Sequence, residues 1–353
     1  MYLFFNGLLF DQLLRQNCRD QGICFSKTKD RSRIRIKMEN LDSKILVGPI
    51  ERSLGRGLHN LGNTCYMNSV LQCLFHLPCL SDILFELRNT HIDDCKLEKC
   101  ILCAFIKTFN DCLVKVGSPW RIRNVLTDIC KTMKINEQED GHEFLRCLTG
   151  SLNDDIMKKI FGFNLISETF CDSCPDMSMI GLEYFMDISV ELQNRPSLEW
   201  ALSDFFSQKT IEDRICDGCN RSGKGKTQYY FEKPPYVLVI HLKRFHMDSF
   251  GRRKKVTDWI PFNLKLDLSP FVKNGNSKIF TYNLRSTINH IGNGALNGHY
   301  TSFIQAANLS FFHFNDSSVS QIGNDEVLQS NSPYVLFYGM ENSSLAAPNK
   351  PGT

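Results

Sequence analysis

The stretch that decides the fold runs from residue 57 to residue 74 and reads GLHNLGNTCYMNSVLQCL. Apolar residues recur there at helical spacing and predict a helix over 64–77, with Asn63 as its N-cap and Pro78 as its stop: Val70, Leu71, Leu74 and Phe75. Cys65 then lies in the first turn, where free N–H groups and the helix dipole favour a thiolate. The polar loop before it offers amide groups that could stabilise an oxyanion. Most cysteines at helix starts are small buried hydrophobic residues, so Cys65 alone decides nothing.

Outward from this stretch, the residue pattern changes from helical to strand-like near residue 160. Regular structure starts near residue 55, the pattern is helical from about 64 to 160, and one helical pattern covers 137–152. Runs rich in β-branched and aromatic residues follow and predict strands over 236–245, 280–291, 299–306, 311–315 and 333–338. Helices followed by an antiparallel sheet indicate the α+β class.

Two of the predicted strands carry polar residues that suit a thiol hydrolase. His299 opens a strand directly after the Gly/Asn-rich loop 292–298, and Asn315 and Asp316 end the next strand. Adjacent antiparallel strands would bring these side chains together. Cys, then His, then Asn or Asp is the chain order of a papain-like triad.

The residues of these motifs, taken together, resemble those of the ubiquitin-specific proteases. GLHNLGNTCYMNSVLQCL resembles the cysteine box of that family, and NGHYTSFIQ with FHFNDSSV resembles its histidine box. EQEDGHEFL (137–145) is similar to the helix that faces the tail of ubiquitin, and YVLVIHLKRF and SPYVLFY are similar to two further family strands. The resemblance covers residues 55–340. It implies a papain-like α+β fold with a helical thumb, an antiparallel β palm and zinc-bearing β fingers, and hydrolysis after the C-terminal glycine of ubiquitin.

The resemblance also implies roles for single residues. Cys65 would attack the carbonyl of the last glycine of ubiquitin, and His299 would deprotonate Cys65 and then protonate the leaving lysine amine. Asn60 would stabilise the oxyanion, and Asn315 would orient His299. We expect Asn315 to accept the Nδ1 hydrogen and leave Nε2 facing Cys65, with Asp316 nearer the oxyanion or a bridging water.

Binding of the ubiquitin tail is assigned by the same resemblance to Asp140, Gln138 and Tyr300. This sequence has Gln138-Glu139-Asp140-Gly141 where the family commonly has Gln-Gln-Asp-Ala. The extra charge and the glycine bear on the affinity for the tail.

Four cysteines have the spacing of metal ligands. Cys171 and Cys174 form one C-x-x-C pair and Cys216 and Cys219 a second. Four thiolates suit tetrahedral zinc, which would be structural because no position stays open for water. The site resembles the zinc site at the fingertips of the family; the alternative is four reduced cysteines without a metal.

A second group of cysteines lies in the helical part of the sequence. Its members are Cys95, Cys100, Cys103 and Cys112, and Cys100 and Cys103 would share one helix face. Because their neighbours are apolar, we expect core packing rather than a second metal.

Composition and charge bear on disulfides, partners and location. The chain has 353 residues, a formal net charge of +3 and 15 cysteines, an odd number that disulfides within one chain could not pair completely. Neither basic run, 27–37 or 252–255, demands a nucleic acid, and the apolar start MYLFFNGLLF is too short to span a bilayer. A signal anchor is the minority reading of that start. We expect an intracellular protein, cytoplasmic or nuclear.

These patterns divide the chain into three parts. We expect a basic disordered extension over 1–54, a monomeric catalytic domain over 55–341 and a loose tail over 342–353. Within the domain, the thumb would cover 55–160, the fingers 161–235 and the palm 236–341. Ubiquitin and ubiquitinated proteins would be the partners, with no nucleic acid required and no membrane.

Two other functions compete with an active deubiquitinase. The first is a catalytically dead ubiquitin-binding module on the same fold, and the second is a protease for another ubiquitin-like modifier. Cys65, His299, Asn315 and Asp316 are all present, which favours activity. Asp140 and the helix that follows it favour ubiquitin.

Overall fold

The structure is a computed structural model, and it describes residues 54–92, 95–152, 154–216, 218–248, 250–273, 279–292, 294 and 297–341. The chain divides between Leu41 and Asp42, and all of the described residues belong to the part that follows this division. Apart from Leu54, the extension expected over 1–54 lies outside the described residues, as do the basic run 27–37 and the tail 342–353.

Helix α3 (Cys65–Phe75) is the buried centre of the helical part, and every one of its residues is buried. Its boundaries differ from the sequence expectation at both ends. Thr64, not Asn63, is the N-cap, because Asn63 adopts a left-handed backbone with φ of 57°. Pro78 does not only end the first helix: it opens α4 (Pro78–Thr90), where the missing N–H of proline costs nothing.

More helices follow in this part of the chain. They are α5 (Ile101–Val114), α6 (Trp120–Asn124), α7 (Leu126–Ile129), α8 (Gly141–Ser151) and α9 (Asp154–Phe161). Helix α8 begins four residues later than the predicted helix over 137–152, because Asp140 is its N-cap and accepts a hydrogen bond from the Glu143 N–H at 2.8 Å. The Tyr66 and Phe144 rings meet edge to face, with centroids 5.4 Å apart, and join α3 to α8.

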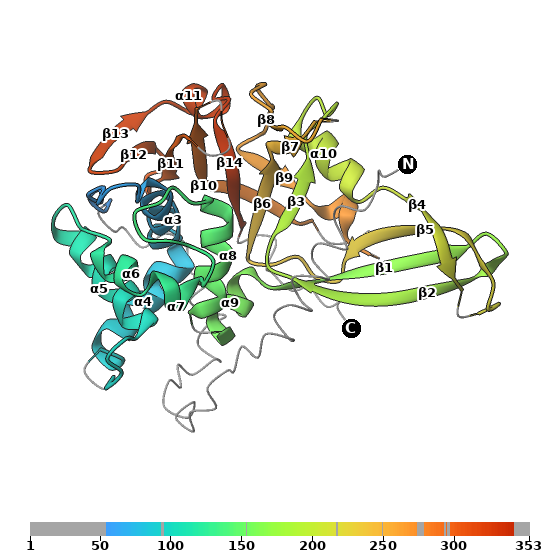
Figure 1. The fold of residues 1–353 in the computed structure, drawn as a ribbon, viewed down its shortest axis with the longest axis horizontal. Coiled ribbons are helices and arrows are strands. Elements are labelled where there is room, and N and C mark those ends of the chain that lie inside the picture. Colours follow the sequence, from blue (N-terminus) through green and yellow to red (C-terminus); the bar gives the residue numbers. More distant parts are fainter. Residues whose placement is uncertain are drawn as a thin grey trace, which may run out of the picture. The chain divides into compact units, whose positions relative to one another are not determined.

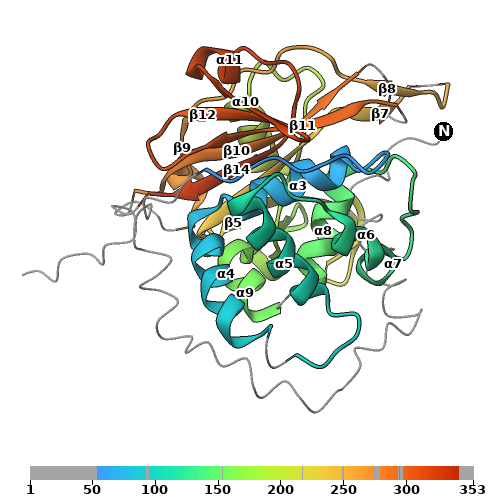
Figure 2. The same ribbon diagram turned by 90° about the vertical axis from the view of Figure 1, so that its left-hand side faces the viewer.

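The large sheet lies against α3 and is built from strands of the second half of the chain (Figures 1 and 2). Its strands follow the order β13-β12-β11-β10-β14-β6-β3, and β9 pairs with β10. They span β3 (Ile188–Glu191), β6 (Val237–Lys243), β9 (Lys265–Asp267), β10 (Thr281–Ile291), β11 (His299–Gln305), β12 (Phe311–Asn315), β13 (Ser318–Ile322) and β14 (Pro333–Met340). Neighbours are antiparallel except β3 and β6, which run parallel.

The five strands predicted from sequence correspond to β6, β10, β11, β12 and β14; β12 has the predicted bounds, and the ends of the others differ by at most two residues. The predicted strand over 236–245 ends early, at Lys243. Arg244 leaves the ladder with a buried side chain that donates hydrogen bonds to the carbonyl oxygens of Pro333, Val256 and Asp258 at 2.6, 2.9 and 3.1 Å.

A second sheet extends away from the helices (Figure 1), in the order β2-β1-β5-β4. Its strands are β1 (Phe163–Cys171), β2 (Cys174–Phe185), β4 (Lys209–Ile215) and β5 (Ser222–Phe231). Within the span 161–235, β3 joins the large sheet instead, and α10 (Leu198–Phe205) packs beside β3. The helical part, the large sheet and the extended sheet correspond to the thumb, palm and fingers of the expected α+β fold.

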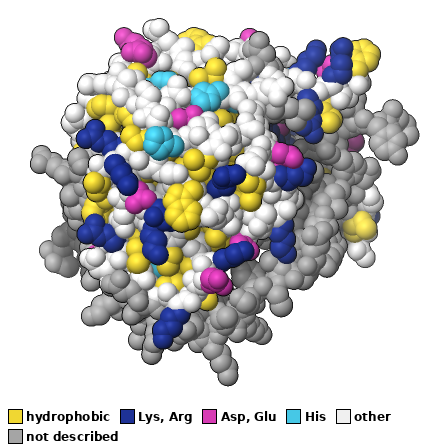
Figure 3. Space-filling model, turned by 60° about the vertical axis from the view of Figure 1, so that its left-hand side comes forward, with side chains coloured by type: hydrophobic (Ala, Val, Ile, Leu, Met, Phe, Trp, Pro, Cys, Tyr) yellow, Lys and Arg dark blue, Asp and Glu magenta, His cyan; other side chains and the backbone are white. Residues whose placement is uncertain are grey.

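The short elements near the large sheet include a basic hairpin. Strands β7 (Phe245–Met247) and β8 (Arg253–Lys255) pair with each other, η1 (Ser269–Phe271) follows β9, and α11 (Asn324–Leu328) precedes β14. The basic run 252–255 is mostly exposed, as a solvated surface would be, and its Arg252 and Lys254 pair with Asp248 at 2.8 and 3.6 Å. On the face drawn in Figure 3, Lys and Arg side chains are interspersed with acidic and hydrophobic ones.

None of the described helices is by itself long and apolar enough to cross a membrane, and only the pair α3 and α4, bent by 89°, meets that test of length and composition together.

Candidate active site

Three elements that are distant in sequence bring the predicted reactive side chains together. Cys65 is the first residue of α3, His299 the first of β11 and Asn315 the last of β12. Helix α3 packs on β11, and β11 pairs antiparallel with β12, so the start of one strand lies beside the end of the other. The Cys65 side chain is 3% exposed. The His299 Nε2 lies 2.7 Å from the Asn315 Oδ1.

The imidazole of His299 favours its charged form. A hydrogen bond with Cys65 raises the pKa of His299 to about 9, with the Asn315 amide and the negative charge of Asp316 acting in the same direction and burial opposing them. A protonated imidazole beside a thiol is the arrangement in which a Cys–His pair carries a thiolate and an imidazolium.

The expectation that the Nδ1 of His299 meets Asn315 is wrong. Nε2, not Nδ1, faces the Asn315 amide oxygen, so Nδ1 is the nitrogen left for Cys65. The reason lies in the strand order. His299 opens β11, and its side chain reaches across to the end of β12. Nε2, the ring nitrogen farther from the backbone, therefore meets β12, and Nδ1 faces α3.

Asp316 turns away from the imidazole and binds the loop before Cys65. Its backbone is left-handed, with φ of 51°. Its carboxylate accepts hydrogen bonds from the Asn68 Nδ2 at 2.7 Å and from the Asn60 Nδ2 at 3.0 Å, and its carbonyl oxygen accepts one from the Leu58 N–H at 2.8 Å. Only a glycine fits at position 57, because an added Cβ would lie 2.4 Å from the Asp316 carbonyl oxygen.

The Asn60 side chain is fixed from both ends. Its Oδ1 accepts a hydrogen bond from the Thr64 N–H at 3.1 Å while its Nδ2 donates to Asp316. An amide nitrogen carries two hydrogens, so the second one is free to meet a developing oxyanion next to Cys65.

Asn68 was not singled out from the sequence. It lies inside α3 and is buried, and besides Asp316 its Nδ2 reaches the carbonyl oxygens of Leu58 and His59 at 3.4 and 3.3 Å. It therefore ties the loop that carries Asn60 to the loop that carries Asp316. The sequence signal for this role was a polar residue three positions after Cys65 in a mostly apolar helix.

The three residues assigned to the tail of ubiquitin all have partners within the chain. Besides capping α8, Asp140 accepts a hydrogen bond from the Tyr334 hydroxyl at 2.6 Å. The Gln138 Oε1 accepts one from the Gly298 N–H at 3.2 Å, directly before His299. Tyr300 is 7% exposed, and its ring lies 3.0 Å from the place where a Cβ on Gly141 would be.

The loop before His299 is held by a lysine that sequence reasoning did not single out. The Lys255 Nζ donates to the carbonyl oxygens of His290 at 2.8 Å and of Gly292 at 2.6 Å. Burial lowers the pKa of this ammonium to about 8. Gly298 is packed so tightly that a Cβ would lie 2.2 Å from the His290 Nε2.

The four cysteines of the fingers meet as metal ligands would. Their sulfur atoms all lie within 4.8 Å of one another, with 3.9 Å between those of Cys171 and Cys219 and 3.5 Å between those of Cys174 and Cys216. Tetrahedral zinc with Zn–S bonds of about 2.3 Å separates its sulfur ligands by about 3.8 Å. The Ser173 N–H points to the Cys171 sulfur at 3.4 Å. This cluster could hold a metal ion.

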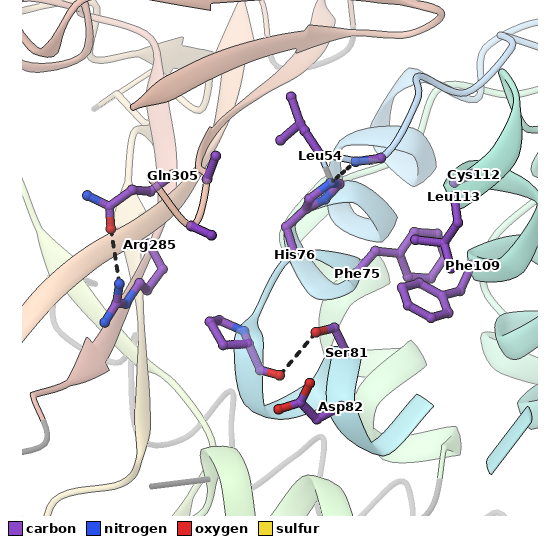
Figure 4. Close-up of a pocket in the computed structure, with 14 residues that line it drawn as sticks. Leu54, Phe75, His76, Ser81, Asp82, Phe109, Cys112, Leu113, Arg285 and Gln305 are labelled. Carbon is purple, nitrogen blue, oxygen red and sulfur yellow. Dashed lines mark hydrogen bonds between the residues drawn. The ribbon is translucent and has the colours of Figure 1, made fainter. Parts of the chain in front are cut away.

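One pocket among the described residues is separate from Cys65 and His299. It lies at the other end of α3 and β11, between Phe75, His76, Phe109, Arg285 and Gln305 (Figure 4). Its polar groups bond to one another: the Arg285 Nη1 donates to the Gln305 Oε1 at 3.1 Å, and the Gly55 N–H to the His76 Nε2 at 3.1 Å. None of the predicted catalytic residues lines it.

Comparison with known proteins identifies relatives over most of the chain. The model of a family described as ubiquitin carboxyl-terminal hydrolase matches residues 56–338. Ubiquitin carboxyl-terminal hydrolase 36 of Drosophila pseudoobscura pseudoobscura is 34% identical over 320 residues, which cover 82% of this chain and 30% of that protein. Its namesake in Drosophila melanogaster is 34% identical over 333 residues, covering 84% and 31%. The chain thus spans about a third of the length of these relatives.

Solved structures show the same fold. The SAGA Ubp8/Sgf11/Sus1/Sgf73 DUB module bound to ubiquitin aldehyde contains a chain that is 27% identical with a TM-score of 0.73, and the match covers 86% of this chain and 73% of that one. The same SAGA DUB module with a cysteine-to-alanine variant of Ubp8, bound to monoubiquitin, gives 25% identity and a TM-score of 0.73, covering 96% and 76%.

Proposed function

This chain belongs to the ubiquitin carboxyl-terminal hydrolase family, and we propose that it is a thiol-dependent deubiquitinase. It hydrolyses the isopeptide or peptide bond after the C-terminal glycine of ubiquitin. The observation that carries the proposal is the contact of His299 with both Cys65 and Asn315, at the mouth of a loop that presents Asn60. A catalytically dead module would not need these reactive side chains to contact one another.

The reaction follows from these positions in two steps. The Cys65 thiolate attacks the carbonyl carbon of the terminal glycine, and the oxygen takes up the negative charge beside the Asn60 amide. The C–N bond then breaks, and the His299 imidazolium gives its proton to the leaving lysine amine. A thioester between Cys65 and ubiquitin remains.

Water completes the cycle. Neutral His299 takes a proton from a water molecule, which attacks the thioester carbonyl and forms a second oxyanion at the same place. The C–S bond breaks and releases the thiolate and the carboxyl group of ubiquitin. The proton taken from water stays on His299, and the carboxyl group gives its own proton to the solvent. Asn315 takes no proton; it fixes the imidazole plane through Nε2 so that Nδ1 meets the sulfur.

Asp316 acts on the opposite side of the site from the imidazole. Its two hydrogen bonds place Asn60 and Asn68, so we assign it to positioning the oxyanion donor. Asp140, Gln138 and Tyr300 are assigned to the channel for the tail of ubiquitin. Gln138 is exposed and Asp140 is half-buried, so a peptide can reach both, whereas the buried Tyr300 contributes as a wall under Gly141.

Zinc is part of the proposal as a structural ion on Cys171, Cys174, Cys216 and Cys219. The sulfur separations of 3.5 and 3.9 Å support it, and four thiolates exclude a water ligand. The ion would staple the tips of the β1–β2 and β4–β5 hairpins and takes no part in the chemistry.

We assign the catalytic domain to residues 55–341, with its thumb over 55–160, its fingers over 161–235 and its palm over 236–341. Ubiquitin and ubiquitinated proteins are the proposed partners, which the ubiquitin complexes of the similar SAGA modules support. The domain would act as a monomer, with no nucleic acid required and no membrane. The free cysteines suit a reducing compartment, which supports a location in the cytoplasm or nucleus.

The test is hydrolysis of a C-terminal fluorogenic derivative of ubiquitin by Cys65→Ala and Cys73→Ala. Both thiols are buried in α3, but burial raises the pKa of Cys73 to about 12, which keeps that thiol neutral and inert. We expect Cys65→Ala to lose all turnover while its affinity for ubiquitin stays within a few-fold, and Cys73→Ala to remain active. Turnover by Cys65→Ala, or hydrolysis of another ubiquitin-like modifier but not of ubiquitin, would overturn the proposal.

A further inference from the structure

A second cluster of metal-binding side chains lies in the thumb. The described residues form two groups in which at least three His, Cys, Asp or Glu ligand atoms all lie within 4.8 Å of one another. One is the finger cluster, and the other consists of His91, Cys95, Cys100 and Cys103. We propose that this thumb cluster binds a structural zinc ion through three thiolates and one imidazole.

The ligands come from the connection between two helices. His91 is the C-cap of α4, Cys100 is the N-cap of α5, Cys103 lies in the first turn of α5, and Cys95 lies between the helices. Figures 1 and 2 place this connection at the end of α4 that is away from the large sheet. The thumb cluster is therefore a separate site from Cys65 and His299.

The distances fit tetrahedral coordination. The His91 Nε2 lies 3.4 Å from the Cys100 sulfur. Zinc with a Zn–N bond of about 2.05 Å and a Zn–S bond of about 2.3 Å separates those two ligand atoms by about 3.6 Å. Three cysteines and one histidine are one of the three common ligand sets of structural zinc, and they close the coordination sphere.

The backbone repeats a feature of the finger cluster. The Cys103 N–H donates to the Cys100 sulfur at 3.4 Å, as the Ser173 N–H does to the Cys171 sulfur, also at 3.4 Å. An N–H bond to sulfur stabilises a thiolate, which is the ligand form. In each of these two C-x-x-C pairs, a backbone N–H two or three residues further on thus donates to the sulfur of the first cysteine.

Packing does not explain the thumb cluster. Cys95, Cys100 and Cys103 are only partly buried, whereas Cys112, the fourth cysteine of the sequence group, is buried. The expectation of core packing therefore fits Cys112 alone. Among the described residues between Leu87 and Ala104, no hydrophobic side chain is buried, and Leu97 is 69% exposed. A connection without its own core gains order from a metal staple.

The experiment is a count of zinc per chain in the full chain, purified under reducing conditions, by elemental mass spectrometry. We expect two zinc ions in the wild type, one in Cys100→Ser and one in Cys216→Ser. Cys112→Ser, a change of a neighbouring cysteine in α5 outside the cluster, should keep both. His91→Cys should also keep both, because it supplies a fourth thiolate, while His91→Ala should lose one.

A measurement on the wild type keeps the test decisive if a variant fails to fold. X-ray absorption at the zinc edge should show one nitrogen ligand for every seven sulfur ligands, the average of a four-cysteine site and a site of three cysteines and one histidine. One zinc per chain that only Cys216→Ser removes, a shell of sulfur alone, or a disulfide among Cys95, Cys100 and Cys103 would each overturn the proposal. Since none of these readouts depends on catalysis, the result is independent of the proposed deubiquitinase activity.

Discussion

Replacing Asp316 by alanine should damage catalysis through Asn60 rather than through His299. The carboxylate accepts hydrogen bonds from Asn60 at 3.0 Å and from Asn68 at 2.7 Å, and it makes no bond to the imidazole. Without it the Asn60 amide is held only through its Oδ1, by the Thr64 N–H and hydroxyl, and its Nδ2 loses the bond that aims it at the oxyanion.

The structure sets the size of the effect. Losing one oxyanion donor costs about 10²–10³ in kcat, or about 2.7–4 kcal/mol. Asn60→Ala should reach that range and Asp316→Ala about 10²-fold, because a misplaced donor still contributes part of the time. The lost bond to buried Asn68 should also lower the free energy of unfolding by about 1.5–3 kcal/mol, the contribution of a hydrogen bond to a charged group.

The assay is a double-mutant cycle on kcat/KM for a fluorogenic ubiquitin substrate. Asn60→Ala/Asp316→Ala should be no slower than the worse single variant, which gives an interaction energy of about 2–3 kcal/mol. Asp316→Asn is the matched control, because asparagine tolerates the left-handed backbone and keeps one acceptor oxygen; it should lose less activity than alanine. Additive losses in the cycle would refute the reasoning, since Asp316 and Asn60 would then act separately.

The remaining predictions concern His299, Asp140 and the finger zinc. The pKa of His299 is raised from 6.5 to about 9. The stability that its protonated form contributes is therefore fully present below pH 6.5 and is lost as the pH rises through 9. We expect kcat/KM to fall over the same rise through pH 9. Asn315→Ala should move this fall in kcat/KM to lower pH and lower kcat moderately, and Asn315→Asp should keep activity. The pH profiles of the wild type and both variants check this. Identical profiles would show that Asn315 does not orient His299. Asp140→Ala should raise KM and also lose about 1 kcal/mol as a lost N-cap, whereas Asp140→Ser should raise KM with Tm preserved; kcat/KM values equal to wild type would count against tail binding. Cys216→Ser should lower Tm and zinc content before kcat changes, and unchanged zinc content would exclude this ligand set.

The helices and strands around the active site could be predicted because each carries its own periodic signal. The predicted strand over 311–315 coincides with β12, and the α+β order follows from helical patterns that stop near residue 160. Ends were less predictable. Residue type favours Asn63 as the N-cap, but its backbone is left-handed and Thr64 takes that position.

The oxyanion side of the site could not be predicted in full, because its bonds join residues about 250 positions apart. Asp316 meets Asn68 across 248 positions and Asn60 across 256. Neither a local period nor a residue spacing encodes such a contact, and Lys255 was overlooked for the same reason. The choice of ring nitrogen on His299 depends on which strand lies on which side of it, which only the assembled sheet decides.

The thumb cysteines show how nearness in sequence can mislead. Cys112 was grouped with Cys95, Cys100 and Cys103, but it lies on the far turns of α5, where its sulfur packs against Gly117. The fourth member of the proposed thumb site, His91, comes from the end of the preceding helix, and its sequence spacing does not distinguish it from a surface histidine.

The measurement that tests the central claim most directly is the reaction of the full chain with ubiquitin that bears an electrophile in place of its C-terminal carboxylate. Intact mass spectrometry should show one ubiquitin added per chain, and peptide mapping should place the bond on the sulfur of Cys65. Cys65→Ala should form no adduct. An adduct on any other of the 15 cysteines, or no adduct from folded protein, would contradict the account.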